Sequence, residues 1–227
     1  MPHLSDFASL AQPRATGWPR TVVGLLLNDP AALPLIGDAV DQPPYKGAPK
    51  KPVLYIKPAN TYAAPGTDVV LPADITEVQV GACLGIQIGQ TATRLNRDNA
   101  LDVVAGYRLV ADLTVPHGVF YRPAIKQKCR DGFCPLGEVI PRSAVANPDD
   151  LTLTVDIDGA APWTTTTANR VRDVRQALVD VTEFMSLHPG DVLLLGIPAQ
   201  PPLARAGQSY RLSAPGFATL SNRLIAG

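Results

Sequence analysis

The sequence contains few of the residues that build covalent or metal-stapled scaffolds. Only three cysteines and three histidines occur among 227 residues. An odd number of cysteines without a C-x-x-C pair argues against a disulfide framework and against a zinc ribbon. The residues concerned are Cys83, Cys129, Cys134, His3, His117 and His188.

The sequence also lacks an excess of charge of either sign and lacks a long apolar run. Twenty basic residues balance twenty acidic ones, which disfavours a nucleic acid or an anionic membrane surface as partner. No segment approaches the length of a membrane span, and the first twenty residues lack the apolar stretch of a signal peptide. We therefore expect a flexible tail at residues 1–20, one domain at residues 21–227 and a cytoplasmic location.

What the sequence does contain is a series of short strand signals separated by proline and glycine. One amphipathic helix is expected at residues 168–187, capped by Thr167, and a shorter helix at residues 97–104. Many strands, few helices and 23 prolines predict a mixed β-rich (α+β) fold. Strands are predicted at residues 22–27, 53–56, 77–80, 82–88, 106–115, 151–157, 191–195 and 209–213, with Gly81 dividing the third from the fourth.

Three separated motifs carry a family resemblance. They read YKGAPKKPVLYIKPANT at residues 45–61, YRPAIKQKCRDGFCPLGE at residues 121–138 and LHPGDVLLLGIP at residues 187–198. In this order they resemble the fumarylacetoacetate hydrolase superfamily, and within it the amino-terminal half of the isomerase/decarboxylases of 4-hydroxyphenylacetate (homoprotocatechuate) degradation. The resemblance runs from about residue 21 to the end, and it implies a β-roll with few helices and a pocket at one end.

The resemblance also implies chemistry on 2-oxo acids, usually with a magnesium or manganese ion that stabilises an enolate. Metal-binding members carry an E-x-E pair in one strand and an Asp in a later strand. When ACLGIQIG is aligned at its final glycine, Gly81 and Cys83 occupy the two glutamate positions, and only Asp112 remains. Glu77 and Gln79 could form a similar pair only after a shift of four residues. We therefore expect weak or absent cation binding, through Asp112 if at all.

A second departure concerns acid–base groups. Catalytic members carry a His three residues before a Glu on a short helix after the first strand, and residues 28–33 (NDPAAL) contain neither. His117 is the one histidine that could reach the pocket, although a solvated loop position is the favoured interpretation.

The remaining candidates are basic and polar. The resemblance places Lys128 in the pocket, where it would stabilise a developing enolate, with Asp112 anchoring a weak cation or orienting Lys128. Tyr121 and Arg122 would hold a distal carboxylate, and Lys57 and Asn60 would line the pocket mouth. A surface position is the alternative for Lys128, and it is disfavoured because the whole surrounding motif matches.

The resemblance implies a subunit of an isomerase/decarboxylase acting on unsaturated 2-oxo dicarboxylates or tricarboxylates. The two reactions are decarboxylation of 5-oxopent-3-ene-1,2,5-tricarboxylate and isomerisation of 2-hydroxyhepta-2,4-diene-1,7-dioate. Two alternatives stay open: a non-catalytic partner of a metal-binding paralogue, or another carbon–carbon hydrolase or decarboxylase of the superfamily. The chain would form a homodimer, or a heteromer with the paralogous subunit.

Overall fold

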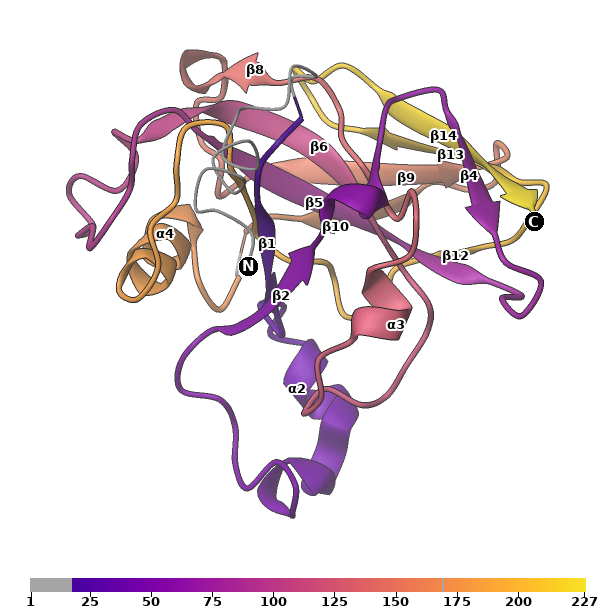
Figure 1. Ribbon diagram of the computed structural model, residues 1–227, viewed down its shortest axis with the longest axis horizontal. Coiled ribbons are helices and arrows are strands. Elements are labelled where there is room, and N and C mark those ends of the chain that lie inside the picture. Colours follow the sequence, from indigo (N-terminus) through magenta and orange to yellow (C-terminus); the bar gives the residue numbers. More distant parts are fainter. Residues whose placement is uncertain (1–17, 169) are drawn as a thin grey trace, which may run out of the picture.

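Two β-sheets provide the framework of the computed structural model, which describes residues 18–168 and 170–227 (Figure 1). The larger sheet has the strand order β2-β1-β11-β5-β6-β8, and β12 pairs with the start of β5. Its strands are β1 (Val22–Leu26), β2 (Val53–Lys57), β5 (Val78–Ile88), β6 (Val104–Thr114), β8 (Ile140–Pro141), β11 (Val192–Leu194) and β12 (Leu203–Ala204).

The second sheet has the order β10-β9-β13-β14-β4. Its strands are β4 (Asp68–Leu71), β9 (Thr152–Ile157), β10 (Trp163–Thr166), β13 (Ser209–Ser213) and β14 (Leu220–Ala226). A short parallel pair, β3 (Tyr62–Ala63) with β7 (Cys134–Pro135), lies outside both sheets. The helices and helical turns are α2 (Ala32–Ile36), η2 (Gly37–Asp41), η3 (Ala59–Thr61), α3 (Ile125–Lys128), η4 (Arg142–Ala144) and α4 (Val174–Thr182). The mixed β-rich (α+β) prediction is confirmed.

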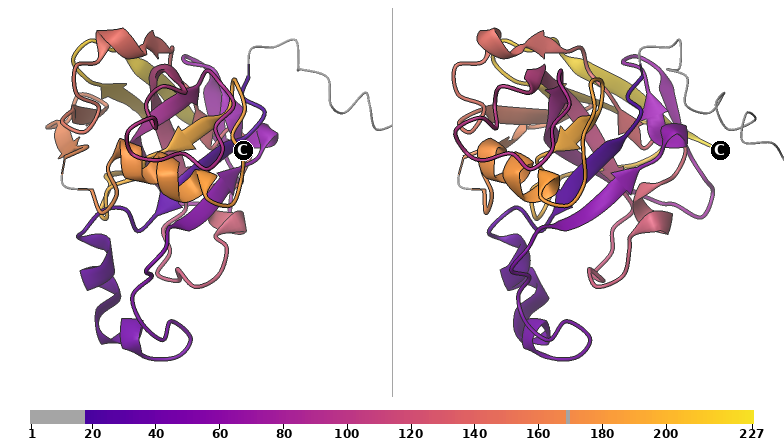
Figure 2. Two further views of the ribbon diagram at one scale, coloured as in Figure 1. Left: turned by 90° about the vertical axis from the view of Figure 1, so that its left-hand side faces the viewer. Right: turned by 60° about the vertical axis from the view of Figure 1, so that its left-hand side comes forward.

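One face of the long β5–β6 pair makes the core. Because side chains alternate along a strand, Val80 and Leu84 of β5 lie on the same face as Leu109 and Leu113 of β6. The part of this face around Val80 and Leu113 packs against the second sheet, and the part around Leu84 packs against α4. Figure 2 shows α2 and the turn after it projecting away from both sheets. The opposite face of the β5–β6 pair carries the polar residues described below beside a smaller apolar cluster that includes Cys83 and Val110.

Most predicted strands are observed, but three local predictions are wrong. β5 runs without interruption through Gly81, so the predicted strands 77–80 and 82–88 are one strand. Residues 97–103 form turns rather than a helix, because the Asn96 side chain accepts hydrogen bonds from the backbone of Asp98 and Asn99.

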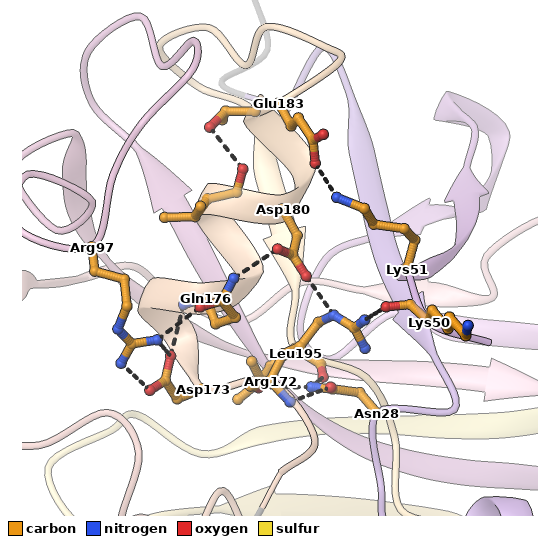
Figure 3. A network of polar contacts seen from close by, with 12 residues as sticks. Asn28, Lys50, Lys51, Arg97, Arg172, Asp173, Gln176, Asp180, Glu183 and Leu195 are labelled. Carbon is orange, nitrogen blue, oxygen red and sulfur yellow. Dashed lines mark hydrogen bonds and ion pairs between the residues drawn. The ribbon is translucent and has the colours of Figure 1, made fainter. Parts of the chain in front are cut away.

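The long helix predicted at residues 168–187 is much shorter, since α4 covers only Val174–Thr182, and Asp173 rather than Thr167 caps it. Before the helix, the Asn28 side chain binds the backbone N–H and C=O of Arg172 and the C=O of Leu195 (Figure 3). After it, Leu187 pairs with Ala92 as an isolated bridge. Tertiary hydrogen bonds thus hold both flanking segments outside the helix.

The predicted tail lies mostly outside the described residues, as does His3. The division into a tail and one domain therefore stays a prediction. Among the described residues, no helix is both long enough and apolar enough to cross a membrane.

Candidate active site: a buried ion cluster beside a pocket

The second face of the larger sheet carries a cluster of charged side chains. Asp112 of β6 lies directly across from Gly81 of β5, on the face opposite the core. Tyr55 and Lys57 of β2 reach the same face, and Lys128 arrives from the end of α3. Because side chains alternate between the two faces of a strand, Tyr55, Lys57 and Asp112 lie on the same face of the sheet.

Asp112 is the centre of the cluster and is fully buried. Its Oδ1 lies 2.6 Å from Lys57 Nζ, and its Oδ2 lies 2.9 Å from Lys128 Nζ. The Tyr55 hydroxyl donates a hydrogen bond of 2.6 Å to the same Oδ2. One carboxylate thus faces two ammonium groups, and we call these four side chains the Asp112 cluster.

Lys57 is a structural member of the cluster. Its ammonium donates hydrogen bonds to the carbonyls of Leu113, Lys128 and Phe133, at 2.9, 2.8 and 2.9 Å. These three bonds use all three of its N–H donors, so its contact with Asp112 Oδ1 is an ion pair rather than a directed hydrogen bond. Lys57 was predicted to line the pocket mouth, but it is buried, is not among the residues that line the pocket, and joins β2 to the segment around α3.

Lys128, in contrast, lines a pocket. Its ammonium donates to Asp112 Oδ2 and to the Thr114 hydroxyl at 2.8 Å, and it lies 4.3 Å from the centre of the Tyr55 ring. The residue is only 1% exposed. The alternative of a solvated surface lysine is thereby excluded.

Burial and charge shift the pKa values of these groups in ways that reflect their pairing. Burial alone would raise the pKa of Asp112, but Lys128 and Lys57 outweigh it and lower that pKa to about 2. Burial, together with the charge of Lys57, lowers the pKa of Lys128 despite the opposing effect of Asp112. Burial and then the charge of Asp112 raise the pKa of Tyr55, so this phenol stays a hydrogen-bond donor.

The pocket beside Lys128 has a volume of about 270 Å³. Its polar side chains are Lys128, Thr114, Gln79 and His117. The remaining lining residues are apolar or small: Leu26, Leu27, Ala32, Leu35, Gly118, Phe120, Ile197, Pro198 and Ala199. The pocket can therefore take a small molecule with one anionic end and an apolar body.

Helix α2 closes one side of this pocket with Ala32 and Leu35. Both side chains are aliphatic, and neither can transfer a proton. The wall that α2 gives the pocket therefore carries no acid–base group among its lining residues.

The positions of the expected metal-binding glutamates are filled by apolar packing. At Gly81 a side chain would collide with Ile197 and with the Asp112 carbonyl, and Cys83 is buried among apolar residues. Glu77 pairs with Arg205 at 3.2 Å, and only Gln79 of the alternative pair reaches the pocket. Residues 18–168 and 170–227 contain no group of three or more His, Cys, Asp or Glu side chains that could hold a metal ion.

The carboxylate of Asp112 is itself committed to the two lysines and Tyr55. A magnesium-type cation requires several oxygen ligands, and it would have to approach two ammonium groups. The residues present therefore do not fit the divalent cation expected for the family.

His117 lies on the loop after β6 and is partly exposed, and it also lines the pocket. Its Nδ1 is 3.0 Å from the carbonyl of Val119. Because a carbonyl only accepts, we assign the proton to Nδ1, which leaves Nε2 as an acceptor. Burial lowers the pKa of His117, and the nearby charge of Lys128 adds to this effect. The ring is therefore neutral at pH 7.

The other predicted binding residues lie outside this pocket. Arg122 is exposed and its guanidinium lies 5.4 Å from the centre of the Tyr121 ring, which in turn packs edge-on against Tyr45. Asn60 donates to the Cys129 carbonyl and to Asp131 Oδ1, so it braces the loop after α3. The predicted roles of Tyr121, Arg122 and Asn60 in substrate binding stay predictions.

Three residues of the site were not identified from the sequence: Tyr55, Thr114 and Ile197. Tyr55 lies inside a quoted motif, but only the strand register shows that its ring covers Gly24, where any side chain would collide with it. Thr114 could have been found two residues after Asp112, because alternation puts both on one face. Ile197 contacts Gly81 across a long sequence separation, and no local signal indicates this.

Comparisons with known proteins identify the family. The sequence model described as "Fumarylacetoacetate (FAA) hydrolase C-terminal" matches residues 21–225. The 4-hydroxyphenylacetate degradation bifunctional isomerase/decarboxylase of Escherichia coli is 38% identical over 205 residues, which are 90% of this chain and 47% of that protein. The chain thus spans about half the length of such curated relatives.

Solved structures agree on the fold. The 5-carboxymethyl-2-hydroxymuconate delta-isomerase of Mycobacterium smegmatis has a TM-score of 0.74 and 25% identity, covering 92% of this chain and 80% of that one. The maleylpyruvate hydrolase of Sphingobium sp. SYK-6, solved with manganese(II) and pyruvate, has a TM-score of 0.73 and 24% identity, covering 93% and 72%. A divalent metal therefore does occur in proteins of this fold.

Proposed function

Because the chain belongs to the fumarylacetoacetate hydrolase family, we propose that it is a subunit of an isomerase/decarboxylase for unsaturated 2-oxo dicarboxylates or tricarboxylates. The observation that carries this proposal is the pocket, in which a buried lysine and a few polar side chains meet a mostly apolar wall. Such a pocket suits a substrate with an oxygen-rich end and an unsaturated carbon chain. The pathway would be 4-hydroxyphenylacetate catabolism, as in the relatives.

In this proposal the residues have separate roles. Lys128 donates a hydrogen bond to the 2-oxo or enolate oxygen, where negative charge develops. Asp112 and Thr114 hold the ammonium in place, and Lys57 adds a second positive charge beside Asp112. His117, with Nε2 free to accept, is the one titratable group of the pocket wall suited to moving a proton near neutral pH.

Isomerisation is the step that this set supports better. Moving a proton along 2-hydroxyhepta-2,4-diene-1,7-dioate needs an oxyanion stabiliser and one acid–base group, and Lys128 and His117 supply them. Decarboxylation of the tricarboxylate is the second candidate reaction, and Lys128 would stabilise the enolate left after carbon dioxide departs.

A different class of function has its own support. Residues 28–33 lack the His and Glu of catalytic members, and Gly81 and Cys83 stand where the resemblance places metal ligands. A non-catalytic partner of a metal-binding paralogue would need only the fold and an interface. The heteromer, the homodimer and the cytoplasmic location stay predictions.

Turnover separates the two classes. The purified chain is assayed on both substrates with and without magnesium, alone and after co-expression with a metal-binding paralogue. Catalysis by the chain alone, reduced ~10²-fold in Lys128→Met, supports the enzyme. Activity that appears only with the paralogue and survives Lys128→Met supports the non-catalytic partner.

A further inference from the structure

We infer that the Asp112 cluster takes the place of the divalent cation, so that the pocket binds the carboxylate end of a 2-oxo acid without any metal. This deepens the proposed function, on which the identity of the ligand rests, whereas metal independence rests on the cluster alone.

The charge of the cluster is the first argument. Two ammonium groups share one carboxylate, and the side chains of all three residues are at most 1% exposed. Tyr55 stays neutral, because burial and Asp112 raise its pKa. The cluster therefore carries a net positive charge, and no further acidic side chain of residues 18–168 and 170–227 pairs with it. A buried charge of this kind is stabilised by a counter-ion at close range.

The position of Lys128 is the second argument. Of its three N–H donors, one goes to Asp112 and one to Thr114. Within the described part of the chain, the structure gives its third donor no hydrogen-bond partner, and the residue lines the pocket. Gln79 and Thr114 add polar groups at the same end. A carboxylate placed there receives a charge-assisted hydrogen bond.

The surroundings exclude a cation as the charge carrier. Ile197 fills the space beside Gly81, and the oxygens of Asp112 already face Lys57, Lys128 and Tyr55. A second positive ion next to the two ammonium groups would meet Coulomb repulsion. The ligand class that remains is an anion whose carbon chain can lie along Leu35 and Phe120.

Calorimetric titration with 2-oxoheptanedioate tests this inference, because this saturated seven-carbon 2-oxo dicarboxylate cannot turn over. We expect the same affinity in excess EDTA and in millimolar magnesium. Lys128→Met should weaken binding by about tenfold to a hundredfold, the range for a lost charge-assisted hydrogen bond. The matched control is Lys126→Met, which removes an exposed lysine of the same helix outside the pocket and should bind normally.

The outcomes distinguish the inference from the function. Binding that requires magnesium, or equal binding by Lys128→Met and the wild type, overturns the inference whether or not the chain turns over substrate. Metal-free binding without turnover, alone or with a paralogue, supports the inference and removes the enzymatic function. If Lys128→Met does not fold, Thr114→Val replaces it, because it removes only a pocket hydroxyl, and unchanged metal-free affinity in that variant counts against the site.

Discussion

The Asp112 cluster and the ion pairs around α4 use the same chemical groups in opposite surroundings. In the cluster, two lysines share one aspartate and no charged side chain is more than 1% exposed. Around α4, the pairs Arg172–Asp180, Arg97–Asp173 and Lys51–Glu183 each join one positive and one negative charge, and two of these three pairs are largely exposed (Figure 3).

The difference indicates what each region contributes. Balanced, solvated pairs hold a helix end or a loop in place at small energetic gain. An unbalanced, buried cluster is costly to desolvate, and replacing it by apolar residues would often be neutral or stabilising. Its position beside a pocket is therefore better explained by ligand binding than by stability. The predictions below test this contrast, beginning with the largest expected effect.

Asp112→Ala should give the largest loss of stability. It leaves two buried ammonium groups without a counter-charge, and removing one partner of a buried ion pair costs about 3–5 kcal/mol. Urea unfolding at pH 7 measures the change. Asp180→Ala is the matched control, because Arg172 keeps a hydrogen bond to the Lys50 carbonyl and some contact with water. Equal losses in the two variants would contradict the contrast.

The affinity for 2-oxoheptanedioate should rise as the pH falls through the pKa of His117. That pKa lies below its ordinary value because of burial and then the charge of Lys128, so the free pocket holds a neutral ring. Protonation adds a positive charge near the bound carboxylate, and a coupling of about one pKa unit raises affinity up to about tenfold. Titrations at pH 7.5 and 5.5 measure this, with His117→Gln expected to remove the dependence. If the pH dependence of the affinity persists in His117→Gln and disappears in His188→Gln, it comes from His188 and the prediction is wrong.

Asp173→Ala should cost about 1 kcal/mol, the typical value for a lost helix cap. The Asp173 side chain accepts a hydrogen bond of 2.7 Å from the backbone of Gln176 and also pairs with Arg97 at 2.6 Å. Arg97→Met removes the pair and leaves the cap, so it should cost much less in the same unfolding experiment. If Arg97→Met lowers the free energy of unfolding as much as Asp173→Ala does, the exposed Arg97–Asp173 pair stabilises the protein as much as the helix cap, which contradicts the prediction.

The sequence predicts the part of this site that depends on local pattern. Apolar runs place β1, β2 and β6, and strand alternation then puts Asp112 and Thr114 on one face. The family motifs identify Lys57 and Lys128. What local pattern cannot predict is contact across the sheet: Tyr55 over Gly24, and Ile197 against Gly81. Motif membership also does not reveal direction, since Asn60 and Arg122 lie in matching segments but outside the pocket.

The same limit explains the ends of α4. Periodicity correctly marks Val174, Leu178 and Val181 as buried, but it extends the helix over residues whose backbone pairs elsewhere. Asn28 holds Arg172, and Ala92 holds Leu187, each across a long sequence separation. Helix propensity is weak compared with such tertiary hydrogen bonds, which therefore set the boundaries.

The smallest effect is expected from Lys51→Met, although Lys51 Nζ lies only 2.6 Å from Glu183 Oε2. The two side chains are 72% and 60% exposed, so water and salt screen their attraction and ordering them costs side-chain entropy. We expect no measurable change in the free energy of unfolding. Lys57→Met is the matched comparison, because it makes the same substitution six residues later at a buried site. It removes a hydrogen bond from the carbonyls of Leu113, Lys128 and Phe133, of which the Phe133 carbonyl keeps the backbone N–H of Leu113 as a donor. Each buried carbonyl left without a donor costs about 1–3 kcal/mol. If Lys51→Met and Lys57→Met had similar free energies of unfolding, burial would not explain the difference between the Asp112 cluster and the ion pairs around α4.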